Sequence, residues 1–317
     1  MVTWVGLDIS KDTIDVGFFQ EDFPTHFKIK NNLIGFKKLV KSCPPGSKFV
    51  MEATGIYYLK CARFLDSLRV YVSVENPLKI KRFSEMSLRR TKTDKKDALL
   101  IARYAENTRP HCWRKPSEEQ LKSQEIQSVI QQYTSIILRM KNEIHAFSNS
   151  GLDNKLIIKS LTKTIADVTK SKVKLEKELY RLMQASFPEE LRLVTSIPAI
   201  GINTACLIIG KIGDGSSFER SGQLASYFGI TPVESYSGTS INKKGVISRM
   251  GSPKVRASLY MCGVSALTCN PMVAAMRVRM KAKGKHNMKI IIAAMNKLVR
   301  QVFGVLKSGK VFDPNFV

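Results

Sequence analysis

Hydrophobic and polar residues alternate with two different periods in the first third of the chain. Short apolar runs and strict alternation predict five β-strands, at residues 4–10, 12–19, 26–30, 48–55 and 70–77. Helical spacing of apolar residues predicts three helices, at residues 32–43, 56–69 and 93–107, with a basic loop before the last of them. Because strands followed by crossover helices form a layered sheet, we predict an α/β domain and place it at residues 1–110.

The middle of the chain, residues 111–190, has a longer and more polar pattern. Residues 117–149 and 152–185 are poor in Gly and Pro, and apolar residues of the second stretch recur at heptad-like intervals. We therefore expect two long helices, broken near Ser150 and Gly151. The pattern leaves two arrangements open, a coiled-coil hairpin and a plain helical bundle.

The last region, residues 191–317, is predicted to be mainly helical. The sequence IPAIG at 197–201 predicts a tight turn between two helical segments. This turn resembles a helix-hairpin-helix, in which turn amides meet a phosphate, but Ala199 stands where the first glycine is usual. A phosphate contact at the turn therefore stays open. Further helices are predicted at 221–232, 254–268 and 286–307, and a Ser-, Gly- and Lys-rich loop at 234–254.

The charge balance narrows the classes of partner. The 317 residues include 51 Lys and Arg against 26 Asp and Glu, and the formal net charge of +25 indicates a polyanionic ligand such as nucleic acid. A membrane surface is the competing polyanion, but no run of about 18 apolar residues predicts a transmembrane segment. The first residues read as a core strand rather than a signal peptide. The six cysteines have no C-x-x-C spacing, so we expect no zinc site, reduced thiols and a cytoplasmic protein.

Positive charge is concentrated near the end of the chain. After Ser235 there are fifteen Lys and Arg and one acid, Asp313, which leaves a net charge of +14. Solvated helix faces normally mix both signs of charge, so a segment with almost no acids favours phosphate binding. We expect phosphate contacts from the cations in and after the Ser- and Gly-rich loop, namely Lys243, Lys244, Arg249, Lys254 and Arg256.

Four carboxylates stand where the predicted strands and a helix could bring them together. Asp8 and Glu52 end two apolar strands, whereas Asp94 and Asp97 lie three residues apart on one face of the helix they open. If the two strands are neighbours, all four acids converge. Mg²⁺, or Mn²⁺ in its place, would then relieve their repulsion and support phosphoryl transfer. Taken singly, each acid also has an ordinary interpretation as a cap, a helix-dipole partner or a lysine partner.

Other charged residues surround these acids. Asp12 and Asp15 lie on the second predicted strand, and we leave them out of the site. The cations around the helix start are expected to hold a nucleic-acid backbone while the aspartates face the metal. These cations are Arg89, Arg90, Lys92, Lys95 and Lys96.

Several segments of the chain resemble one known protein family. In the first half they are GLDISKDTIDV, MEATGIYY and TKTDKKDALLIARY. In the second half they are SIPAIGINTA, LASYFGITPVESYSGTS, SRMGSPKVRASLY and VFGVLKSGKVFD. In this order, the segments resemble the DEDD transposases, a family that includes bridge-RNA-guided insertion-sequence transposases and Piv-type site-specific recombinases.

The resemblance implies a fold and a metal site. The N-terminal domain would be RuvC-like, with an RNase H-like mixed sheet and flanking helices. The long helices and a C-terminal transposase domain would follow. Asp8, Glu52, Asp94 and Asp97 would form the catalytic, metal-binding tetrad.

The resemblance also implies a nucleophile and a set of partners. Ser237 falls on the serine that attacks DNA and becomes joined to it, with Ser235, Thr239 and Ser240 close by. Such an ester conserves bond energy, so strands can be exchanged without ATP. The implied partners are donor and target DNA duplexes, a guide (bridge) RNA, and further copies of the chain in a dimer or tetramer at the nucleoid. The tetrad of one subunit would meet the serine of another, and the long helices would supply dimer contacts.

The sequence is compatible with three functions. The leading one is a site-specific DNA recombinase, acting as a transposase or an invertase. One alternative is a Mg²⁺-dependent endonuclease of the Holliday-junction type, which would cut DNA without a covalent adduct at Ser237. The other is a non-catalytic nucleic-acid-binding protein, for which Asp94→Asn would leave all activity intact.

Overall fold

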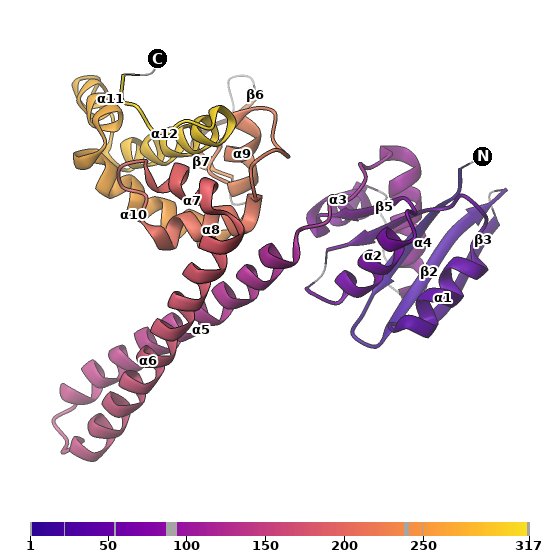
Figure 1. Cartoon of the computed structure of the whole chain (residues 1–317), viewed down its shortest axis with the longest axis horizontal. Helices are drawn as coiled ribbons and strands as arrows, with labels where there is room; N and C mark the ends of the chain where they lie inside the picture. The colour runs from indigo at the N-terminus through magenta and orange to yellow at the C-terminus, as the bar shows by residue number, and fades with distance from the viewer. Residues whose placement is uncertain are drawn as a thin grey trace. The chain divides into compact units, whose positions relative to one another are not determined.

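The structure, a computed structural model, describes residues 2–21, 23–53, 55–86, 94–237, 241–248 and 250–315. Within these ranges it does not describe the side chains of residues 94, 95, 234–237 and 241–246. The chain divides into two compact units, Met1–Lys115 and Pro116–Val317, each of which we describe by itself (Figure 1). The two long middle helices fall within the second unit.

The first unit is built on a mixed five-stranded sheet with the order β3-β2-β1-β4-β5. Its strands are β1 (Trp4–Ile9), β2 (Thr13–Gln20), β3 (Phe23–Lys30), β4 (Lys48–Glu52) and β5 (Val72–Glu75). β2 runs antiparallel to both β1 and β3, whereas β4 runs parallel to β1 and β5. The predicted α/β sheet is confirmed, although the third strand begins earlier than its predicted start at residue 26.

Alternate residues of the strands point to opposite faces of the sheet and meet different helices. α1 (Leu33–Ser42) and α2 (Tyr58–Ser67) cover the face that carries Leu7 and Met51. α3 (Pro77–Met86) and α4 (Asp94–Thr108) cover the opposite face, which carries Trp4 and Val50. Because side chains alternate along a strand, Asp8 lies on the face covered by α4.

Helix α4 lies directly on β1 and β2 because two glycines leave room for its backbone. Gly6 and Gly17 are cross-strand partners in the sheet. A Cβ atom at Gly6 would collide with the carbonyl oxygen of Ala98, and it would lie 2.5 Å from the nitrogen of Ala102. A Cβ atom at Gly17 would lie 2.7 Å from the nitrogen of Leu99. The two glycines therefore decide how close α4 comes to the sheet.

Helix α3 corrects the sequence prediction, which had a basic loop before residue 93. The helix begins at Pro77, whose fixed φ suits the first helical position. The Asn76 side chain accepts a hydrogen bond from the Leu78 nitrogen at 2.9 Å and so caps the helix start. Ile80 is buried, and the Phe83 ring packs edge-on against Tyr104 of α4. The lysines made this segment resemble a loop, and its apolar face could be recognised only from its packing against α4.

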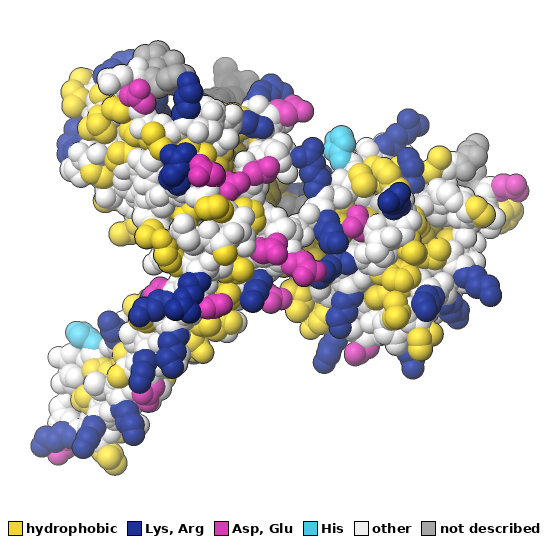
Figure 2. Space-filling model, viewed as in Figure 1, with side chains coloured by type: hydrophobic (Ala, Val, Ile, Leu, Met, Phe, Trp, Pro, Cys, Tyr) yellow, Lys and Arg dark blue, Asp and Glu magenta, His cyan; other side chains and the backbone are white. Residues whose placement is uncertain are grey.

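The second unit begins with two long helices that form a hairpin (Figure 1). α5 (Glu118–Ser148) opens with a capping box at Ser117, and α6 (Lys155–Ser186) returns alongside it. The two predicted long helices are therefore confirmed, with their break next to the predicted one. Many Lys and Arg side chains lie along this hairpin on the face shown in Figure 2.

The base of the hairpin is joined to the rest of the unit by polar side chains. Gln127 and Gln124 of α5 donate hydrogen bonds to the carbonyl oxygens of Cys206 and Gly210, both at 2.8 Å. Gly210 allows α5 to approach this closely, because a Cβ atom at this position would lie 2.7 Å from the Oγ of Ser123 on α5. Helix α5 is thus held against the unit's globular part.

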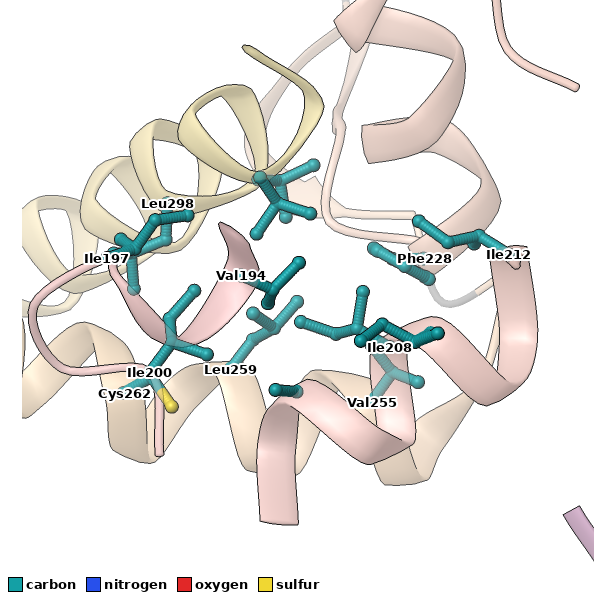
Figure 3. Packing of buried hydrophobic residues seen from close by; sticks show 14 of the residues in the cluster. Val194, Ile197, Ile200, Ile208, Ile212, Phe228, Val255, Leu259, Cys262 and Leu298 are labelled. Carbon is teal, nitrogen blue, oxygen red and sulfur yellow. The ribbon is translucent and has the colours of Figure 1, made fainter. Parts of the chain in front are cut away.

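The remaining helices pack around one hydrophobic core (Figure 3). Val194, Ile208, Phe228, Leu259 and Leu298 come from five different helices and meet in it. The helices are α7 (Pro188–Thr195), α8 (Ile202–Ile212), α9 (Ser221–Phe228), α10 (Pro253–Cys269), α11 (Pro271–Ala282) and α12 (Asn287–Ser308). The mainly helical character predicted for this region is confirmed.

The turn between α7 and α8 has the predicted hairpin form. Ile197 and Ile200 are buried in the core, and the Ile200 nitrogen donates to the Ile197 carbonyl oxygen at 3.0 Å. Ala199 adopts a φ of 83°, in the left-handed region that favours glycine. Ala199 therefore keeps the backbone conformation of the glycine that is usual at such turns.

Two parts of this unit differ from the prediction. The region 234–254, predicted as a loop, contains an antiparallel hairpin of β6 (Pro232–Ser237) and β7 (Ile241–Ile247). Helix α11 was not predicted, and it follows α10 after Asn270, whose Oδ1 accepts from the Val273 nitrogen at 3.3 Å. The apolar pattern of α11 is weak because Val273 is its buried residue and cations occupy its end.

No single helix among the described residues is long and apolar enough to cross a membrane. Helices α10 and α11 reach that length and hydropathy only together, and they are bent by 86°. Val255 and Leu259 of α10 belong to the core of the second unit.

Candidate active site

Four carboxylates form a row across the α4 face of the sheet. Asp8 is paired in register with Asp15, and Glu52 is paired with Glu75. Leu7 is paired with Met51 in the parallel pair β1–β4, which places the next residues, Asp8 and Glu52, side by side. The row therefore runs over four neighbouring strands, in the order Asp15, Asp8, Glu52 and Glu75.

The outer two acids of the row have strong partners of their own. Asp15 is buried; it forms an ion pair with Lys28 at 3.0 Å and a hydrogen bond with His26 at 2.8 Å. Glu75 is also buried; it accepts from Lys79 at 2.8 Å and from the Tyr104 hydroxyl at 3.2 Å.

These contacts explain why the outer acids are stable in a buried position. The hydrogen bond with Glu75 raises the pKa of Lys79, and burial raises the pKa of Tyr104. Both shifts keep protons on the groups that face the Glu75 carboxylate. Lysine and tyrosine partners thus stabilise the two outer acids in their buried positions.

The inner two acids lie beneath the start of α4. Asp8 and Glu52 are half-buried at the carboxyl ends of β1 and β4. Ala98 of α4 lies on Gly6, whereas the guanidinium of Arg103, further along α4, lies 3.7 Å from the ring centroid of Phe19. Phe19 lies on β2 next to the partner of Val5, so α4 runs from the end of β1 towards its beginning.

This direction brings the two aspartates of α4 to the same end of the sheet as Asp8 and Glu52. Asp97 is half-buried and immediately precedes Ala98. Asp94 begins α4, one turn earlier, and its side chain lies outside the described residues. The structure thus places Asp8 beside Glu52 and directs the start of α4 towards the same end of the sheet.

The donor set suits a hard divalent cation. Carboxylate oxygens are the ligands that Mg²⁺ and Mn²⁺ prefer, and the predicted ligand set consists of carboxylates alone, without the Cys or His that softer metals prefer. Among the side chains that the structure describes, no group of three or more His, Cys, Asp or Glu is close enough to hold a metal ion. Asp8, Glu52 and Asp97 are in that set and do not form such a group, and the side chain of the fourth acid, Asp94, lies outside it.

Ser237 is the last residue of β6 and is paired with Ile241 of β7. It therefore stands at the end of a β-hairpin rather than in the open loop that the sequence predicted. Ser235 lies two residues earlier on the same strand and is paired with Lys243. The side chains of these four residues, and residues 238–240 with Thr239 and Ser240, lie outside the described residues.

The predicted phosphate-binding cations have different positions. Arg89, Arg90, Lys92 and Arg249 lie outside the described residues, as do the side chains of Lys95, Lys243 and Lys244. Lys96 is exposed on α4. Lys254 is half-buried at the start of α10, and its charge adds to the effect of burial in lowering the pKa of Lys211. Arg256 donates to the Phe228 carbonyl oxygen at 3.4 Å and so also supports the end of α9.

Two features of the site were missed in the sequence. Glu75 ends its strand in VSVE just as Glu52 ends its strand in FVME, so the position of the acid was a usable signal. Lys211 gave no signal, because only the fold places it near Lys254.

Comparison with known proteins decides the family. A family model described as "Transposase" matches residues 5–149, and one described as "Transposase IS116/IS110/IS902 family" matches residues 191–277. The pilin gene-inverting protein of Moraxella bovis is 31% identical over 322 residues, which cover 98% of both chains. The chain belongs to the IS116/IS110/IS902 transposase family.

Other members of this transposase family are more distant. The transposase for insertion sequence element IS1328 of Yersinia enterocolitica is 22% identical over 338 residues, covering 98% of this chain and 99% of that one.

Among solved structures, the T. thermophilus RuvC in complex with Holliday junction substrate is 10% identical and covers 34% of this chain and 96% of that chain, with a TM-score of 0.25. The family resemblance expected from the sequence motifs is confirmed by the transposase and pilin gene-inverting relatives.

Proposed function

We propose that this transposase-family chain is a site-specific DNA recombinase that cuts and rejoins DNA strands through a serine–DNA intermediate. The observation that carries the proposal is that Asp8 and Glu52 lie side by side near the ends of two adjacent parallel strands, directly after the register pair Leu7 and Met51, beneath the helix that begins with Asp94. The relative named for pilin gene inversion, similar over 98% of the chain, supports recombination rather than binding alone.

The acidic tetrad would hold Mg²⁺, or Mn²⁺ in its place, through its carboxylate oxygens. Such an ion, when bound, supplies Lewis-acid stabilisation of the charge that develops in phosphoryl transfer. Asp8 and Glu52 are held by the sheet, and Asp94 and Asp97 by α4. The tetrad therefore rests on rigid elements, which keep the ligand positions constant during the reaction.

In the proposed reaction, the Oγ of Ser237 attacks a DNA phosphorus atom. A bond from phosphorus to Oγ forms, a bond from phosphorus to a sugar oxygen breaks, and the proton of the serine hydroxyl is released while the sugar oxygen takes one up. A sugar hydroxyl of another strand then attacks the phosphoserine and frees Ser237. Each step exchanges one phosphate ester for another, so no ATP is needed.

Strand exchange between donor and target duplexes requires several active sites, so we propose a homodimer or tetramer. The α5–α6 hairpin supports this assembly because it exposes large apolar side chains, including Leu138 and Leu156, which are 60% and 82% exposed. We further propose that a guide RNA supplies target recognition at the nucleoid, since cations that hold phosphates read no bases. Sequencing the RNA that co-purifies with the protein tests this point, and a protein that recombines its sites after complete RNA removal would contradict it.

A denaturing gel after mixing the protein with target DNA tests the covalent step. The wild-type protein should give a protein–DNA adduct that Ser237→Ala abolishes. Ser235→Ala is the matched control, because Ser235 lies on the same strand of the same hairpin, and its adduct should persist. Loss of the adduct in Ser235→Ala alone would reassign the nucleophile. Full-rate cleavage by Ser237→Ala would support the alternative Mg²⁺-dependent endonuclease.

A further inference from the structure

The second unit contains a cavity of about 700 Å³ between α12, the end of α7, the start of α11 and the segment that follows α12. Its volume lies in the range of pockets that enclose a small ligand. Neither the acidic tetrad nor Ser237 lines it.

Cations and apolar side chains line different depths of this cavity. Four cations and one acid, Asp313, contribute to its lining, so positive charge dominates. Lys310 and Arg300 are exposed, whereas Val305 is buried and Phe312 is half-buried. The cavity therefore suits a ligand that carries both an anionic group and a flat apolar group.

Three of these cations are available for an anion. Arg192 forms an ion pair with Glu189 at 2.8 Å. Lys297, Arg300 and Lys310 form no ion pair with another residue in the described part of the chain. Cations in excess of acids favour the binding of a phosphate group, which accepts charge-assisted hydrogen bonds from Lys and Arg.

The walls of the cavity are held in place by buried hydrogen bonds. The Nδ2 of Asn270 donates to the Oε1 of Gln301 at 2.9 Å, which ties the start of α11 to α12. The Phe312 nitrogen donates to the Oγ of Ser196 at 2.8 Å, which fixes the segment after α12 against the end of α7. A cavity with anchored walls is formed before its ligand arrives, so little ordering opposes binding.

Gly304 keeps one wall of the cavity open. It lies within α12 and lines the cavity, and a Cβ atom placed there would meet nothing within 4 Å. Glycine inside a helix lowers helix stability relative to alanine. The glycine is therefore not required by packing, and its position preserves space at the cavity wall.

We propose that this cavity binds one unpaired nucleotide of a nucleic-acid strand, with its phosphate on Lys297 and Arg300 and its base against Phe312. The proposal rests on the proposed function for the presence of nucleic acid, but not on the chemistry of Ser237. A nucleotide fits because it joins a phosphate to a flat ring that stacks on an aromatic side chain. The surrounding quarter of the chain, with fifteen cations after Ser235, would guide the neighbouring phosphates.

Fluorescence anisotropy of a labelled single-stranded oligonucleotide tests the proposal on the full-length protein. The probe is about eight nucleotides long, and a second probe of equal length has abasic sites in place of its central bases. Wild-type protein should bind the intact probe about tenfold more tightly, because stacking is lost with the bases. Gly304→Leu should fill the cavity and bring both probes to the abasic level.

Gly222→Leu is the matched control. Gly222 is exposed in helix α9, and a Cβ atom there also meets nothing within 4 Å. This variant should keep the wild-type preference for the intact probe, and thermal melting should show both leucine variants folded. Lys297→Gln with Arg300→Gln should weaken both probes alike.

Two results would overturn the proposal. One is equal binding of the intact and abasic probes by the wild-type protein. The other is a Gly304→Leu variant that keeps the full preference. Binding of the probes by Ser237→Ala separates this question from the covalent chemistry, since that variant should bind both probes as the wild-type protein does even where strand exchange fails.

Discussion

Asp8 and Asp15 face each other across two strands, and so do Glu52 and Glu75, but their surroundings differ. Asp15 forms an ion pair with Lys28 and a hydrogen bond with His26, and Asp8 lies next to Glu52 beneath the start of α4. A cation beside a buried carboxylate stabilises its charge, and a bound divalent cation would relieve the repulsion between two adjacent carboxylates. The role of each acid therefore depends on its neighbours rather than on its residue type.

Asp8 and Asp15, which are paired across two strands, provide a matched test of the proposed metal site. Asp8→Asn should reduce strand cleavage by roughly 100-fold or more, because it removes a charged ligand position. Asp15→Asn, on the paired residue, should leave cleavage within a few-fold of wild type. Cleavage assays over a Mg²⁺ titration measure both. An active Asp8→Asn variant, together with an active Asp94→Asn variant, would favour the non-catalytic binding protein.

The buried thiols of the first unit predict an alkaline loss of stability. Burial raises the pKa of Cys43 and of Cys61 from 9.0 to about 12. The folded state thus holds these protons more tightly than the unfolded state, so this stability is complete below pH 9 and is lost as the pH rises towards 12.

The size of this effect is measurable by urea unfolding. At about pH 10 each thiol should account for about 1 kcal/mol of lost stability. Cys61→Ala should therefore lose less stability than the wild-type protein between about pH 8 and pH 10. Equal losses in both proteins would show that Cys61 is ionised in the folded state.

At the scale of elements, α4 determines the geometry of the site. Its contact with Gly6 and Gly17 fixes its height above the sheet, and the hydrogen bond from Tyr104 to Glu75 anchors its second half. Asp97 is part of the same rigid helix, so its position over β1 follows from these contacts.

Substitution of Gly6 tests this control by α4. Gly6→Ala should lower the free energy of unfolding by about 1–3 kcal/mol, because the added methyl group meets helix backbone rather than a flexible side chain. It should also reduce cleavage, since α4 must move away from Asp8. Gly222→Ala, where the added atom meets nothing within 4 Å, is the control and should be neutral or stabilising. A fully stable Gly6→Ala variant would contradict the close approach of α4 to β1.

The turn between α7 and α8 provides a second prediction at this scale. Ala199 has a φ of 83°, which costs a residue with a side chain about 1–2 kcal/mol. Ala199→Gly should remove this strain and raise stability by about 0.5–1 kcal/mol, after the greater freedom of glycine in the unfolded chain is subtracted. Ala199→Val should lower stability. Thermal melting measures both, and a lower melting temperature for Ala199→Gly would contradict the left-handed turn.

At the scale of the whole molecule, charge is distributed unevenly along the chain. Fifteen cations follow Ser235 with one acid, and Lys283 and Lys285 are exposed between α11 and α12. Under the proposed function, these exposed lysines would contact a nucleic-acid backbone. The excess of charge therefore predicts binding that depends strongly on salt.

The salt dependence gives a quantitative expectation. The logarithm of the DNA affinity should fall linearly with the logarithm of salt concentration, with a slope of about −0.9 for each phosphate that the protein neutralises. Lys283→Gln with Lys285→Gln should make the slope less steep by about 0.9 for each phosphate that is no longer neutralised. Affinity measurements on duplex DNA at several salt concentrations test this. An unchanged slope would show that these lysines do not bind phosphate.

The sequence by itself determined the elements with a clear local period and the family to which they belong. The strand that ends in Asp8, the helix that carries Asp97 and the two long helices could be predicted because their apolar spacing is contained within each segment. The charge excess and the motifs around Glu52 and Ser237 are likewise properties of composition and order. Helix α11, whose apolar period is weak, was missed for the same reason.

Only the tertiary structure decided which residues meet. The register of β1 with β4 made Asp8 and Glu52 neighbours, and the fold brought Lys28 and His26 to Asp15. The fold also placed Ser237 at a hairpin end and enclosed the basic cavity beside Gly304. These outcomes depend on contacts between residues distant in the chain, and the spacing within a single segment does not encode such contacts.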